Sequence, residues 1–244
     1  MLDVIGTILV GAAMAVILTG LVTTVPLSTS GRLTLAGVLG GWVGLVGAVA
    51  SSGGLSSPVT LLAIFGAPLL TTAVLVLASP AARHALMAIP IQLLVGLNGI
   101  RLAGVLFMFL AAAGRLSGPF PYQAGWGDFI TGALAIPAAW LVASQTRLRD
   151  RLIVAWNSFG MLDLVVAVTL GLISRNGSPV QLIYAGVGTA AMQTLPWAFV
   201  PTALVPFFLI AHAIIFAQIR AHARAKAGRI PSAVDEMNLA RQVG

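Results

Sequence analysis

The chain alternates long apolar runs with short polar ones, and seven of the apolar runs are long enough to cross a membrane. A helix rises 1.5 Å per residue, so about 20 apolar residues span a hydrocarbon core of about 30 Å. The pattern therefore predicts an all-α, polytopic bundle of seven transmembrane helices with a basic tail at 220–244. The predicted spans are 4–25, 33–50, 59–79, 91–114, 124–143, 152–173 and 198–219.

The segment 180–195 fits the pattern less clearly, because it is only moderately apolar and carries Gln181, Gln193, Gly186 and Gly188. It is compatible with a surface helix, a re-entrant segment or an eighth span. Cytoplasmic loops carry an excess of Lys and Arg, so the distribution of charge distinguishes these topologies.

Seven spans with the N-terminus outside and the C-terminus inside leave Arg115 and Arg175 in the outer loops and all other loop and tail cations inside. The inner ones are Arg32, Arg83, Arg147, Arg149, Arg151, Arg220, Arg224, Lys226, Arg229 and Arg241. An eighth span would move the last five of these to the outside. We therefore expect seven spans, with 180–195 as a surface or re-entrant cap.

Composition agrees with a protein whose main solvent is lipid, since 59% of its residues are hydrophobic and 8% are charged. We expect an integral membrane protein. The net charge of +7 lies in short loops and the tail. It therefore predicts contact with anionic lipid headgroups and no nucleic-acid partner.

Several cofactor chemistries are excluded or disfavoured by residue type. The chain has no cysteine, which excludes disulfides and thiolate metal sites. The only lysine, Lys226, lies in the tail, so a Schiff base within the membrane is impossible. His84 and His222 fall outside the spans that hold the other polar residues, and we expect neither a metal nor a cofactor.

Glycines follow one side of the second span. Gly37, Gly40, Gly41 and Gly44 recur at steps of three, one and three residues. Such a bare face lets another helix approach closely. The partner is either a helix of the same chain, a second copy or another protein.

Charged side chains lie inside three of the later spans. Arg101 is about 15 Å and Asp163 about 16 Å from the inner boundary, counted along their helices. An isolated charge near the bilayer centre costs about 2.5–3.5 kcal/mol on insertion scales. A close pair removes most of this cost, so Arg101 and Asp163 are predicted to be in contact. Asp128 is expected nearer the outer boundary, about 6–9 Å below it.

These charges and their polar neighbours form the candidate site. Ionisable groups within spans are by default candidates for a substrate or proton path, and histidine titrates near neutral pH. No residue is assigned a catalytic role. The candidates for ligand binding or a proton path are Asn98, Arg101, Asp128, Asn157, Asp163 and His212.

Three functions are consistent with this site. The first is binding or transport of a small polar or anionic solute, with Pro201 and Pro206 providing a bend in the last span. The second is a non-catalytic scaffold or complex subunit, in which the charges fix which helices pack together. The third is a membrane-embedded enzyme that uses an aspartate as acid or base.

Two short resemblances accompany these residues. Gly125-Trp126-Gly127-Asp128 resembles the GxGD motif of intramembrane aspartyl proteases, and Asp163 would be the second aspartate. In those proteases the other aspartate precedes the motif, whereas the preceding helix here offers Arg101.

A second resemblance rests on two motifs together. The first is Gly125 to Asp128, and the second consists of Trp156-Asn157, Gly160 and Asp163-Leu164. This combination resembles a group of uncharacterised bacterial multi-pass membrane proteins. That resemblance covers about 92–212, and it implies an integral inner-membrane protein with no assigned activity.

Overall fold

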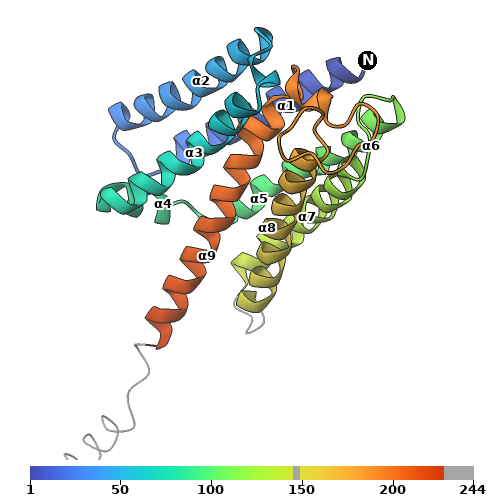
Figure 1. The fold of residues 1–244 in the computed structure, drawn as a ribbon. Helices are drawn as coiled ribbons and strands as arrows, with labels where there is room; N and C mark the ends of the chain where they lie inside the picture. The colour runs from blue at the N-terminus through green and yellow to red at the C-terminus, as the bar shows by residue number, and fades with distance from the viewer. Residues whose placement is uncertain (145–148, 228–244) are drawn as a thin grey trace, which may run out of the picture.

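A computed structural model describes residues 1–144 and 149–227, and this part of the chain is helical with no strand (Figure 1). Seven helical stretches are long and apolar enough to cross a membrane, so the predicted all-α bundle of seven spans is confirmed. The α-helices are α1 Leu2–Thr24, α2 Thr29–Ser51, α3 Pro58–Ala78, α4 Pro80–Met87, α5 Ile91–Leu97, α6 Leu106–Ala112, α7 Phe120–Ala143, α8 Arg149–Ile173 and α9 Val205–Ala227. The short segments are η1 Gly54–Ser56, η2 Asn98–Val105, η3 Ala190–Gln193 and η4 Val200–Leu204.

Two of the spans are built from more than one helical type. The fourth consists of α5, the 3₁₀ segment η2 and α6, and the last consists of the π-helical η4 followed by α9. The first part of the basic tail is helical, because α9 continues to Ala227. The rest of the predicted tail, with Arg229 and Arg241, lies outside the described residues, as does Arg147.

Serine caps set the start of three helices. Ser57 accepts a hydrogen bond from the backbone N–H of Thr60, and Pro58 occupies the first helical position. Ser79 and Pro80 repeat this arrangement at α4, a short helix that was not predicted. Such caps satisfy backbone donors that the helix leaves free, and proline is favoured where no N–H is needed.

The core of the bundle is formed by the later helices. α7 packs against α5, η2, α6 and α8, while α9 packs against α8, α5 and α3. In Figure 1, α2 and α3 lie on the opposite side of α9 from α7 and α8. Only 11% of the apolar window of α2 and 6% of that of α3 are buried, so the rest of the described chain leaves most of the surface of these two helices uncovered.

The glycine face of α2 has no close neighbour in this structure. A Cβ added to Gly37, Gly40, Gly41 or Gly44 would meet no atom within 4 Å among the described residues. Close packing of this face against another helix of the same chain is therefore absent from the described structure. A second copy or another protein on this face stays a prediction.

An irregular cap, residues 174–199, joins α8 to η4 in place of an eighth span. Its one short helix is η3, so 180–195 forms neither a long surface helix nor an eighth span, and the expected seven spans with a cap agree with the structure. Ser117 exchanges backbone and side-chain hydrogen bonds with Gly188 of the cap at 3.0 and 2.7 Å. Trp197 donates to Asp3, which also pairs with Arg115. The N-terminus, the α6–α7 loop and the cap thus share one side of the bundle, and which membrane face this is remains a prediction.

Candidate functional site

Arg101 lies at the centre of a buried polar cluster that joins the last four spans. Its Nε donates to Asp128 Oδ1 at 2.7 Å, and its Nη2 donates to Asp163 Oδ2. Its Nη1 donates to the carbonyl of Gly160 at 3.2 Å and lies 3.1 Å from His212 Nε2. We call Arg101, Asp128, Asp163 and His212 the ion cluster. The predicted contact between Arg101 and Asp163 is confirmed.

Asp128 belongs to the same cluster, although it was predicted nearer the outer boundary. The predicted span that contains Asp128 starts at Ala124, whereas the helix α7 begins at Phe120. Asp128 is therefore eight residues into the helix, about 12 Å along its axis. At that depth the long side chain of Arg101 reaches both carboxylates.

His212 enters the cluster as a neutral hydrogen-bond acceptor. An arginine nitrogen can only donate, so His212 Nε2 must accept from Arg101. The ring proton is then on Nδ1, which lies 2.7 Å from Asn157 Oδ1 and donates to it. Asn157 Nδ2 in turn donates to the His212 carbonyl at 3.0 Å. Asn157 therefore fixes the orientation of the imidazole.

Asn98, the remaining candidate, does not join the cluster. It is fully buried, and its Nδ2 donates to the carbonyl of Leu94 in its own helix at 2.9 Å. Its Oδ1 has no hydrogen-bond partner among the described residues. The shared helix face of Asn98 and Arg101 did not bring the two side chains to one site.

Glycines make room for both carboxylates. Asp163 lies directly against Gly127, and Asp128 lies directly against Gly104, so a Cβ at either glycine would overlap the aspartate. Any other residue at these positions would push a carboxylate away from Arg101.

Two further glycines bring the remaining parts of the cluster together. A Cβ on Gly160 would lie 2.6 Å from Cε1 of the His212 ring. A Cβ on Gly132 would lie 2.6 Å from the backbone nitrogen of Leu102, the residue after Arg101. The sequence shows these glycines, but not which residue each would face across a helix interface.

The 3₁₀ segment η2 carries Arg101 and is unusually long. 3₁₀ runs beyond three or four residues are uncommon, and a run inside a longer helix often marks a hinge or a strained site. η2 has eight residues and packs tightly on α7, where Gly125 faces the carbonyl of Gly104. This close packing brings Arg101 within reach of α7 and α8 together.

The two aspartates do not form a dyad of the protease type. Each carboxylate binds a different nitrogen of Arg101, and no hydrogen bond joins the two carboxylates among the described residues. The cluster holds one guanidinium, two carboxylates and a neutral imidazole. Counted formally, the cluster therefore has one more carboxylate than it has cations.

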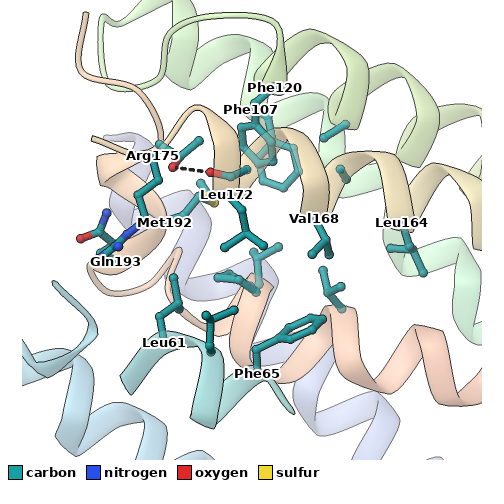
Figure 2. Close-up of a pocket in the computed structure, with 18 of the residues that line it drawn as sticks. Leu61, Phe65, Phe107, Phe120, Leu164, Val168, Leu172, Arg175, Met192 and Gln193 are labelled. Carbon is teal, nitrogen blue, oxygen red and sulfur yellow. Dashed lines mark hydrogen bonds between the residues drawn. The ribbon is translucent and has the colours of Figure 1, made fainter. Parts of the chain in front are cut away.

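Two cavities meet at Asp128. The larger has a volume of about 760 Å³ that includes space open to its surroundings, lies between α3 and α8, and runs from Arg175 and Gln193 towards Leu164 (Figure 2). The smaller, about 520 Å³, lies beside α1 and is lined by both Arg101 and Asp128. The residues common to both linings are Phe107, Asp128, Leu164, Val200 and Val205. Asp128 is also the most accessible of the three charged members, since 15% of its side chain is exposed.

Arg175 is a buried cation that the sequence placed in an outer loop. It is 3% exposed, and its Nη2 donates to the carbonyls of Leu55 and Ser56. In the sequence, a single Arg two residues after an apolar run indicates only a charged loop that follows a transmembrane helix. Only the folding of the cap over the bundle shows that it is buried.

No curated protein and no solved structure matches the chain. The model of one protein family, described as "Domain of unknown function (DUF8737)", matches residues 58–220. This range contains the whole ion cluster and every residue that lines the larger cavity. Because the match covers more than half of the chain, the protein belongs to this family of unknown function.

Proposed function

We propose that this integral membrane protein, in a bacterial cytoplasmic membrane, binds a small polar solute at Asp128 and lets it pass between the two cavities. The observation that carries the proposal is the position of Asp128. Its carboxylate lines both cavities, and its Oδ2 makes no hydrogen bond to any described residue. Ionisable groups at this depth are candidates for a solute or proton path.

The charge of the cluster favours a solute that donates hydrogen bonds or carries positive charge. Every nitrogen of Arg101 is already engaged by a carboxylate, a carbonyl or His212. An anionic solute would have to displace one of the two carboxylates. The excess carboxylate, in contrast, is available to a donor at Asp128.

The remaining cluster residues hold Asp128 in place. Arg101 holds one oxygen of Asp128 by a hydrogen bond. The guanidinium is held in turn by His212, whose ring Asn157 orients. Phe107 and Leu164 stand between the cavities. Movement of η4, which contains Pro201 and whose Val200 lines both cavities, would change the width of this passage.

A ligand screen tests this proposal. A ligand that binds only the folded state raises the unfolding midpoint by mass action. We expect at least one polar metabolite to stabilise the detergent-purified protein at pH 5.5 or 7.5, and Asp128→Asn to remove the effect. The control is Asp150→Asn, which changes the same residue type at the start of α8, away from the cavities. A ligand whose effect survives Asp128→Asn would place the site elsewhere.

A second candidate is a structural role within a membrane scaffold or complex subunit. It is favoured by the complete engagement of Arg101, which links four spans through buried bonds. Removing one partner of a buried ion pair typically destabilises by about 3–5 kcal/mol, because the other charge is left unpaired.

Two variants measure the structural contribution of the pair. Arg101→Gln should lower the unfolding midpoint strongly, and adding Asp163→Asn should recover part of the loss. Recovery without any ligand effect in the screen would favour the structural role. If the double variant is no more stable than Arg101→Gln, the pairing does not stabilise the bundle.

A further inference from the structure

Arg175 is a buried cation without a counter-ion. No carboxylate lies within ion-pair distance of it among the described residues, and its Nε has no hydrogen-bond partner there. Burial lowers the pKa of its guanidinium, because the charged form is desolvated. Its hydrogen bonds go to the uncharged carbonyls of Leu55 and Ser56, whereas buried charges are normally paired, so this guanidinium is a candidate to bind an anion.

The same guanidinium stands at one end of the larger cavity. Figure 2 shows Arg175 and Gln193 near one end and Leu164 towards the other, with Leu61 and Phe65 of α3 facing α8. Along α8 the apolar wall from Leu164 to Leu172 is about 12 Å long. This length and lining fit an extended alkyl chain of moderate length.

The polar end of this cavity lies at the boundary of the bilayer. Arg175 follows the last residue of α8, Ile173, by two positions, and the cap covers it. Thr189 and Gln193 of the cap line the cavity at the same end. A lipid oriented as in the bilayer places its headgroup at the boundary and its chain towards the centre, which is the polarity of this cavity.

The geometry points to a lipid-binding site here: we infer that the larger cavity holds the acyl chain of an anionic amphiphile whose carboxylate or phosphate binds Arg175. The cavity is partly open, and transmembrane helices form most of its walls, so we expect the chain to enter from the lipid. The proposed headgroup site at Arg175 is separate from Asp128, although an acyl chain in this cavity and a solute passing through it would exclude each other.

Probes with one chain and different heads test the head preference. Binding of decanoate, decanol and decylammonium to the protein in a neutral maltoside detergent is measured by thermal shift. We expect decanoate to bind at least tenfold more tightly than decanol, and decylammonium more weakly than either. Inorganic phosphate without a chain should not stabilise the protein. Equal binding of decanoate and decanol, tighter binding of decylammonium, or stabilisation by phosphate alone would each overturn the inference.

Variants separate the contributions of head and chain. Arg175→Gln should reduce decanoate binding to the level of decanol. Val168→Phe narrows the cavity and keeps Arg175, so both probes should bind at least tenfold more weakly, whereas Val165→Phe on the exposed face of α8 should change neither. Full binding to Val168→Phe would overturn the inference even if Arg175→Gln fails to fold. Asp128→Asn should retain decanoate binding, which distinguishes this site from the proposed solute site.

Discussion

The ion cluster depends on residues that have no side chain as much as on those that are charged. Gly127 and Gly104 leave space that the carboxylates of Asp163 and Asp128 fill. A methyl group at either position competes with a carboxylate for the same volume. Packing and electrostatics are therefore coupled at this site.

Gly127→Ala should displace Asp163 and weaken its bond to Arg101. Breaking a buried pair outright costs about 3–5 kcal/mol, so even a partial loss should lower the unfolding midpoint clearly. The matched control is Gly96→Ala, where a new Cβ meets no atom within 4 Å. In that helix Ala is intrinsically favoured over Gly by about 0.5–1 kcal/mol. Equal midpoints for the two variants would mean that Gly127 does not shape the cluster.

The charged pair was predictable from the sequence, and the glycine contacts were not. Depth along a span follows from counting residues, and the cost of a lone charge demands a partner, so Arg101 and Asp163 could be matched. Which face of one helix meets which face of the next depends on helix rotation. That rotation also left Asn98 outside the cluster and brought Gly160 beside His212.

At the scale of elements, the last span shows how a proline is accommodated inside lipid. Pro206 has no N–H, so the carbonyl of Thr202 four residues earlier lacks its usual helical donor. The indole of Trp42 in α2 donates to this carbonyl at 3.1 Å. A neighbouring helix thus satisfies a backbone group that the bilayer cannot.

Trp42→Phe should therefore destabilise the protein by about 1 kcal/mol, the typical net worth of one hydrogen bond. Trp140→Phe, at an indole that is 80% exposed, should have little effect. Thermal unfolding of the two variants in one detergent makes the comparison. A loss as large for Trp140→Phe as for Trp42→Phe would count against this role of α2.

The spans themselves were predictable because membrane thickness imposes a length on every apolar run. The cap was less so, since its fold rests on contacts between loops that are far apart in sequence, such as Ser117 with Gly188. The 3₁₀ form of η2 was not predicted either, and this segment lies close to α7 at Gly132.

At the scale of the whole molecule, the family match does not include the first two spans. The family match begins at the start of α3 and includes the helices that carry the ion cluster. α1 lies outside the match, yet Leu9, Val10 and Ala13 from it line the smaller cavity. We infer that α1 completes a passage whose chemistry resides in the matched residues.

The orientation of this bundle is open to a direct test, because the chain contains no cysteine. Single cysteines at Ser52 and Ser30, both exposed, lie at opposite ends of α2. The positive-inside rule predicts that an impermeant thiol reagent labels Ser52→Cys in intact cells and Ser30→Cys only after permeabilisation. The reverse pattern would place the N-terminus inside.

The most direct test of the account is whether a small polar molecule reaches Asp128 in the folded protein. A single cysteine replaces Asp128 and, as the buried control in the same helix, Ala135, which has no exposed surface. The reagent is a small trimethylammonium methanethiosulfonate, applied to membrane vesicles. If a polar solute can reach Asp128, the reagent should label Asp128→Cys and not Ala135→Cys. Labelling of Asp128→Cys no faster than that of Ala135→Cys would contradict the proposed solute path. The ion cluster would then only stabilise the packing of the helices.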